Sequence, residues 1–290
     1  MHALLSKLGL GAAQFRFDGT GSRGRGPEAE VSDILGIAAR SGLSVLDASV
    51  SYASAETMIG AAMPRPSPFK VMVKTARCDR GPDFIEIEAR ASLARLGLEA
   101  GDGIVVQAAG DLFSPYGPAL WDKLQDMKDQ GLFARVGVAC HASDDPAGIA
   151  RRFKPDFIQA PASLLDQRLL LDGTLAQIRE LDVEVHLRSV FLQGLLFLPL
   201  DRMPAPMKTV APGLSRVRRM IAEGRSDPLQ AALGFALSRP EASAVIVGVA
   251  TAAELSAVVA AAGSPPPDLD WEAMAIEDLS ALDERRWAAA

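Results

Sequence analysis

The chain has 290 residues, which is long enough for a large hydrophobic core and leaves one or two domains open. It is 49% hydrophobic and 23% charged with a net charge of −6, so it does not have the basic character of a general nucleic-acid binder. Cys78 and Cys140 match no metal-ligand spacing, and we expect no metal site and two reduced thiols in a cytoplasmic protein. We also expect no membrane span and no signal peptide.

Short β-branched runs alternate with amphipathic segments along most of the chain. Eight such strand–helix units close naturally into a barrel, and no linker divides them, so we predict a single-domain (β/α)8 TIM barrel over residues 1–290. An open doubly wound sheet is the alternative, although its glycine fingerprint is missing. The predicted strands are Leu8–Phe15, Leu43–Ala48, Phe69–Thr75, Asp102–Gln107, Arg135–Ala139, Asp156–Gln159, Val183–Val190 and Ser243–Val247. The predicted helices are Glu28–Ser41, Ser54–Met63, Asp83–Leu96, Gly117–Gln130, Asp145–Arg152, Gln167–Leu181 and Thr251–Ala262.

Three segments interrupt this alternation. Residues 16–27 are rich in Gly and Arg and predict a flexible loop, which is either simply solvated or brings an arginine to a phosphate or carboxylate. Residues 199–213 are rich in Pro and predict a loop on the substrate side of the barrel. Residues 271–290 are expected to form a C-terminal helix and tail, with the helix over Trp271–Asp283.

Polar residues end several of the predicted strands. The carboxyl ends of barrel strands carry the active site in this class of fold, and Asp47, Lys74 and Gln107 lie at three of them. Tyr52 follows Asp47 in the next turn. A lysine ammonium near a phenol stabilises the phenolate, so Tyr52 can act as a general acid while Asp47 orients Lys74. The same residues also fit an Asp–Lys pair that only braces two strands, with Tyr52 as an aromatic at the rim.

Several motifs follow one another in a characteristic order. They are DASVSYASAETMIG at residues 47–60, then VMVKTA, FIQAPASLLDQR, LRSVFLQGLL and VIVGVATAAEL. Together they resemble the aldo-keto reductase superfamily over nearly the whole chain, and LRSVFLQGLL is similar to the version found in a bacterial branch. This resemblance implies a (β/α)8 barrel and an NAD(P)H-dependent oxidoreductase that reduces a small aldehyde, ketone or sugar carbonyl. It also implies catalytic roles for Asp47, Tyr52 and Lys74.

The histidine that family members usually carry after the fourth strand is Gln107 here. The amide of Gln107 can donate a hydrogen bond to a carbonyl oxygen but cannot transfer a proton. Losing a preorganised donor costs about 2.7–4 kcal/mol of barrier, and a substituted donor costs less, so we expect weakened reduction. The alternative is a catalytically impaired relative that acts as a binding or regulatory module. A lyase that uses Lys74 as an amine nucleophile is a further reading of the same fold.

The resemblance also implies a nicotinamide coenzyme, NADP in most of the family, with NAD possible. The residues expected to contact it are Ala139, Cys140, Gln159, Arg188, Ser189, Gly194, Gly248, Thr251 and Glu254. Gln159 is expected at the carboxamide, and Arg188 is expected to stack on the ring or to be a surface ion-pair partner. Glu254 would repel a 2′-phosphate, whereas an acidic residue can accept from ribose hydroxyls, so NADPH and NADH both stay open. Beyond a small-molecule substrate we expect no partner, neither nucleic acid nor membrane, and the sequence does not predict an oligomeric state.

Overall fold

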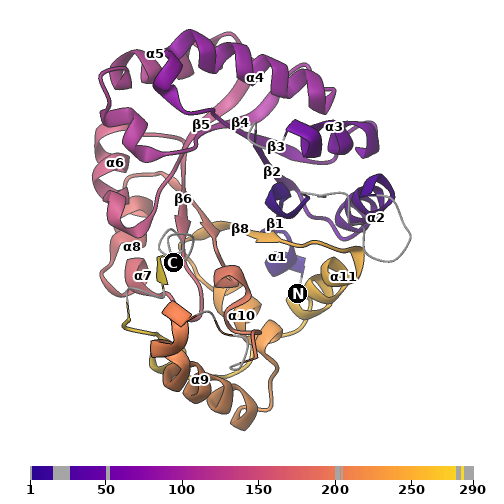
Figure 1. Ribbon diagram of the computed structural model, residues 1–290, viewed down its shortest axis with the longest axis vertical. Helices are drawn as coiled ribbons and strands as arrows, with labels where there is room; N and C mark the ends of the chain where they lie inside the picture. Colours follow the sequence, from indigo (N-terminus) through magenta and orange to yellow (C-terminus); the bar gives the residue numbers. More distant parts are fainter. Residues whose placement is uncertain are drawn as a thin grey trace.

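The structure is a computed structural model that describes residues 2–15, 27–49, 53–199, 203, 205–278 and 282–283. Within these residues, eight parallel strands pair in chain order, and β8 closes the ring onto β1 (Figure 1). The strands are β1 (Leu8–Gly11), β2 (Val45–Ser49), β3 (Lys70–Lys74), β4 (Gly101–Val106), β5 (Phe133–Ala139), β6 (Phe157–Pro161), β7 (Glu184–Arg188) and β8 (Ala242–Gly248). The predicted (β/α)8 barrel is confirmed.

Helices surround the strands on the outside of the barrel (Figure 1). Several begin with Pro in the first turn, where the missing N–H costs no hydrogen bond, and α10 is also capped by the Asp227 carboxylate. The helices are α1 (His2–Leu5), α2 (Pro27–Arg40), α3 (Ala53–Ala62), α4 (Pro82–Leu96), α5 (Gly117–Asp129), α6 (Pro146–Phe153), α7 (Arg168–Leu171), α8 (Thr174–Glu180), α9 (Ala211–Glu223), α10 (Pro228–Leu237) and α11 (Ala252–Ala262). Within the described residues, no helix has the length and apolar character needed to cross a bilayer.

Some helices differ from the sequence prediction. The single helix predicted over Gln167–Leu181 is two helices, because Gly173 between them has a φ of 77°, which breaks an α-helix. The helices α9 and α10 between β7 and β8 were not predicted. The Pro-rich loop predicted over residues 199–213 is shorter than expected, because a 3-10 segment spans Ala205–Val210 and α9 begins at Ala211. The predicted Gly/Arg loop at 16–27 lies outside the described residues, apart from its last residue, which begins α2.

The helix predicted over Trp271–Asp283 is wrong where the chain is described. A 3-10 turn spans Glu272–Met274, and Ala275 is already extended with a ψ of 143°. Other elements bond this backbone: Arg216 donates to the Ala275 carbonyl at 3.2 Å, and the Ile276 amide donates to the loop after β6 at 2.9 Å. These tertiary hydrogen bonds replace the bonds that a continuing helix would make.

Side chains fill the interior of the barrel towards the amino ends of the strands. The ring of Phe157 on β6 is fully buried, and Gly103 on β4 and Gly137 on β5 leave room for it, since a Cβ at either position would press on the ring. At the amino ends of the strands, Arg135 donates to Asp102 and Glu184, each at 2.9 Å. This closed base leaves the carboxyl ends of the strands as the place where a ligand can enter.

Candidate active site

An ion pair joins β2 and β3 at the mouth of the barrel. Lys74, the last residue of β3, donates a hydrogen bond from Nζ to Oδ2 of Asp47 on β2. The Asp47 side chain is only 7% exposed and that of Lys74 18%. Because so little water reaches the pair, the attraction between the two charges is stronger than at an open surface.

A third strand contributes to the same group. Gln159 on β6 is fully buried and donates through Nε2 to Oδ1 of Asp47 at 3.1 Å. Both oxygens of the Asp47 carboxylate are therefore bonded, one from β3 and one from β6. The structure thus brings together three of the residues that the sequence predicted for the site.

Gln107 follows β4 directly and borders this group. Its backbone amide donates to Oγ1 of Thr75 at 3.1 Å, and Thr75 is the residue after Lys74. The Gln107 side chain is exposed. Tyr52, the predicted general acid, lies outside the described residues, and the description resumes with Ala53 at the start of α3.

The second half of the 47–60 motif has a packing role. Glu56 is 1% exposed and accepts from Ser92 Oγ and from Arg95 Nε, the latter at 2.7 Å, which ties α3 to α4. Gly60, one turn later, lies so close to α4 that an added Cβ would overlap the Arg95 carbonyl oxygen. These two residues hold α3 in place, and α3 begins directly after the segment that contains Tyr52.

The ends of β5 and β7 form a second group. Arg188, at the end of β7, donates through Nη2 to the carbonyl oxygen of Cys140 at 2.8 Å and lies 3.4 Å from Nδ1 of His141. Ala139 and Cys140 are buried, and burial raises the pKa of the Cys140 thiol, which keeps it neutral. Arg188 is therefore held at the barrel mouth by the backbone that directly follows β5.

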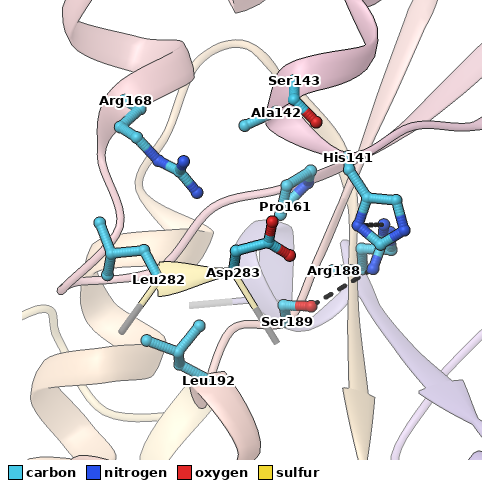
Figure 2. Close-up of a pocket in the computed structure, with 10 residues that line it drawn as sticks. All are labelled: His141, Ala142, Ser143, Pro161, Arg168, Arg188, Ser189, Leu192, Leu282 and Asp283. Carbon is cyan, nitrogen blue, oxygen red and sulfur yellow. Dashed lines mark hydrogen bonds between the residues drawn. The ribbon is translucent and has the colours of Figure 1, made fainter. Parts of the chain in front are cut away.

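A pocket opens beside this second group. Figure 2 shows Arg188 and His141 on one side of it, Arg168 on the other, and Asp283 between them. Its lining residues are His141, Ala142, Ser143, Pro161, Arg168, Arg188, Ser189, Leu192, Leu282 and Asp283. The predicted residue Gly194 belongs to the adjoining 3-10 turn, Leu192–Gly194. Sequence reasoning missed Arg168 and the two tail residues, because no local pattern reports that they come together.

The remaining predicted residues lie apart, where β8 leads into α11. Thr251 Oγ1 accepts from the Glu254 amide at 3.1 Å, and Glu254 Oε2 accepts from the Ala250 amide at 2.8 Å, which is a reciprocal helix cap. The Ala252 amide, the first of the helix, donates to Oε1 of Glu30 on α2 at 2.5 Å. No local pattern predicts Glu30, because its contact joins α2 and α11, which lie far apart in the sequence. Gly248 ends β8 and is exposed.

The comparisons with known proteins agree with this geometry. The model of the aldo/keto reductase family matches residues 7–276. The chain belongs to the aldo/keto reductase family. This reductase is accordingly an NAD(P)H-dependent oxidoreductase, as its motifs predicted. No curated protein sequence matches it significantly.

Solved structures of aldo-keto reductases share the fold of this reductase. One from Bacillus halodurans, in its holo form, superposes with a TM-score of 0.74 at 20% identity, over 90% of this chain and 87% of the other. A Klebsiella pneumoniae aldo/keto reductase in complex with NADP and acetate gives 0.67 at 17% identity, over 89% and 86%. Aldose reductase from Giardia lamblia gives 0.68 at 16% identity, over 93% and 91%.

The reductase has an unsatisfied buried acceptor that fits a nicotinamide. Within the described part of the chain, Oε1 of Gln159 is buried without a hydrogen-bond partner. A buried amide oxygen of this kind needs a donor, and the carboxamide NH2 of a nicotinamide is one. Because Gln159 is fully covered, neighbouring groups must shift before a ligand reaches it. Gln159 therefore fits the nicotinamide end of the coenzyme, whereas amides at the start of α11 already donate to carboxylates.

Proposed function

We propose that this reductase converts a small aldehyde, ketone or sugar carbonyl to the alcohol, with Tyr52 as the general acid. The observation that carries the proposal is the shielded Asp47–Lys74 pair, held by Gln159 at the carboxyl end of the barrel. In the sequence, Tyr52 stands five residues after Asp47 and directly before α3. An ion pair that only braced two strands would not need a buried amide from a third strand.

The proposed reaction divides the work among these side chains. A bound reduced nicotinamide supplies the hydride. Tyr52 donates its phenolic proton to the carbonyl oxygen, and the Lys74 ammonium stabilises the phenolate that remains. Asp47 orients Lys74 through their hydrogen bond. Gln107 donates an amide hydrogen bond to the same carbonyl oxygen without giving up a proton.

Substitution of Tyr52 tests the proposal. Coenzyme consumption with a broad panel of aldehydes and ketones should fall by about 100-fold or more in Tyr52→Phe, as expected when a general acid is lost. Tyr116→Phe is the matched control, because Tyr116 is the only other tyrosine and is exposed at the start of α5. Equal rates in the wild type and Tyr52→Phe would remove Tyr52 from the mechanism.

A second candidate function is a binding or regulatory module that keeps the coenzyme site. Gln107, which cannot transfer a proton, and the buried, neutral Cys140 favour it. The two functions separate in one experiment, in which coenzyme binding and turnover are measured on the same preparation. Tight coenzyme binding without reduction of any carbonyl in the panel would favour the module over the enzyme.

We further propose that the barrel is one folding domain located in the cytoplasm. The strands close a single ring with no linker between halves. Cys78 and Cys140 are both free and buried, which fits a compartment that keeps thiols reduced. A single cooperative unfolding transition, followed by both fluorescence and circular dichroism, is the result expected for one domain.

A further inference from the structure

We infer that this reductase selects NADH over NADPH, and that Glu30 and Glu254 at the start of α11 make the selection. The inference rests on the proposed function, because it concerns the coenzyme of that reaction. In (β/α)8 barrels, phosphate groups commonly bind where the loops after the seventh and eighth strands meet a helix amino end. The helix α11 begins at Ala252, four residues after β8 ends at Gly248, so its start is the place to examine.

The amides that could hold a phosphate there already have partners. The Ala252 amide donates to the Glu30 carboxylate at 2.5 Å, and the Ala250 amide donates to the Glu254 carboxylate at 2.8 Å. The Glu254 amide donates to Thr251 Oγ1 at 3.1 Å. Of the first three amides of α11, at least two are thus bonded by side chains, and a phosphate would have to displace them.

Over the residues that the structure describes, the charge at this helix start also disfavours the additional 2′-phosphate of NADPH. A phosphate monoester carries about −1.5 to −2 charges at pH 7, and it would approach two carboxylates. Among the described residues, the side chains hydrogen-bonded to this helix start are Thr251, Glu30 and Glu254, and none of them is cationic. The favourable end of the helix dipole is already used by the carboxylates, so little of it is left to attract the 2′-phosphate of NADPH.

The same carboxylates suit the coenzyme that lacks this phosphate. The 2′-hydroxyl of an adenosine ribose is a donor, and an acidic side chain is the usual acceptor for it in NAD sites. Glu254 is exposed, so its carboxylate can accept from a ribose while it caps the helix. Glu30 is half-buried and bonded to α11, and it contributes its charge rather than a contact to the coenzyme.

Coenzyme titrations of matched variants test the inference. Binding of NADH and of NADPH would be followed by quenching of the tryptophan fluorescence, without substrate. The wild type should bind NADH at least about tenfold more tightly than NADPH, since two carboxylates near a phosphate correspond to that much repulsion or more at a protein surface. In Glu254→Gln, Glu30→Gln and the double variant, this ratio should fall stepwise towards one. Glutamine keeps an oxygen that can accept from the same amides, so the helix cap is preserved.

Glu180→Gln is the control for net charge, because it removes one charge on α8, on the other side of the barrel from α11 (Figure 1). It should leave the ratio unchanged. Equal or tighter binding of NADPH by the wild type would overturn the inference, and so would a ratio that does not change in the double variant. If neither coenzyme binds, the proposed function itself is overturned together with this inference, whereas a reversed preference leaves the proposed function intact.

Discussion

At the scale of single residues, Gln107 separates this reductase most clearly from the pattern of its family. Its backbone is held beside Lys74 through the hydrogen bond to Thr75, and its amide side chain cannot transfer the proton that the expected histidine would carry. A neutral amide donor polarises a carbonyl less than a charged or proton-sharing imidazole does. We therefore expect slow reduction, because the negative charge that develops on the substrate's carbonyl oxygen is weakly stabilised. Coenzyme binding should not limit the rate.

The variant Gln107→His should reduce carbonyls faster than the wild type. We expect a gain of about tenfold in the single-turnover rate, a part of the 10²–10³ that a complete donor contributes. The rate of hydride transfer would be measured by stopped flow with bound coenzyme. Gln177→His on exposed α8 is the control and should change nothing. A slower Gln107→His enzyme would mean that Gln107 has a role of its own.

The sequence was sufficient to predict three polar residues of the site. Asp47, Lys74 and Gln159 could be predicted because polar groups towards the carboxyl ends of apolar parallel strands meet at one edge of the barrel, although the structure continues β2 and β6 two residues beyond Asp47 and Gln159. Glu30 and Arg168 could not, because each reaches its place through contacts between segments far apart in the chain. Tyr52 remains a prediction, since it lies outside the described residues.

At the scale of elements, the contact between α3 and α4 explains a glycine that the sequence shows only as part of a motif. Gly60 allows the two helices to approach until the Arg95 carbonyl lies where a side chain would begin. Glu56 adds a buried ion pair with Arg95 one turn earlier. In the sequence α3 follows Tyr52 directly, so this contact holds the first described element after the predicted general acid.

The variant Gly60→Ala should destabilise the fold by about 1–3 kcal/mol, because the methyl group meets backbone that cannot move aside easily. Urea unfolding would measure the free energy of unfolding. Gly36→Ala on α2 is the control, since its added Cβ meets only the flexible end of Arg40 at 3.2 Å. Helix propensity should leave Gly36→Ala equal to or more stable than the wild type. A Gly60→Ala protein as stable as Gly36→Ala would contradict the close approach.

The elements that sequence reasoning missed have identifiable physical causes. Residues 231–237 of α10 are all buried, so the helix is apolar on every side and has no amphipathic period to detect. Leu214, Val217 and Ile221 of α9 do have helical spacing and could have been predicted. The helix predicted over Trp271–Asp283 was wrong for another reason: its backbone makes hydrogen bonds to other elements, and these override the local helix preference.

At the scale of the whole molecule, the amino ends of the strands contribute to stability, whereas the carboxyl ends carry the candidate site. The base is closed by Arg135, which binds Asp102 and Glu184, while His186 stacks on Phe157 and lies 3.3 Å from the Glu184 carboxylate. The hydrogen bond from His186, with the charge of Arg135, lowers the pKa of Glu184 to about 2. The mouth instead carries the Asp47–Lys74 pair and the pocket beside Arg188.

The lowered pKa of Glu184 predicts how stability depends on pH. A carboxyl whose folded pKa lies below its ordinary value of 4.5 stabilises the fold above that pH and loses this contribution as the pH falls towards about 2. The side chain is 44% exposed, so water screens the interaction, and we expect no more than about 1 kcal/mol. Urea unfolding should therefore show Glu184→Gln less stable than the wild type at pH 7, with a gap that narrows below about pH 4.5. A gap that stays constant down to about pH 3 would contradict this origin of the stability.

The central claim is that Tyr52 donates the proton in hydride reduction of a carbonyl at this barrel mouth. The most direct measurement uses coenzyme deuterated at its hydride position and follows deuterium in the alcohol product by mass spectrometry. The wild type should produce alcohol that carries one deuterium, and Tyr52→Phe should bind the coenzyme but yield about 100-fold less labelled product in the same time. Equal labelling by Tyr52→Phe, or coenzyme bound by the wild type with no labelled alcohol from any carbonyl, would contradict the claim.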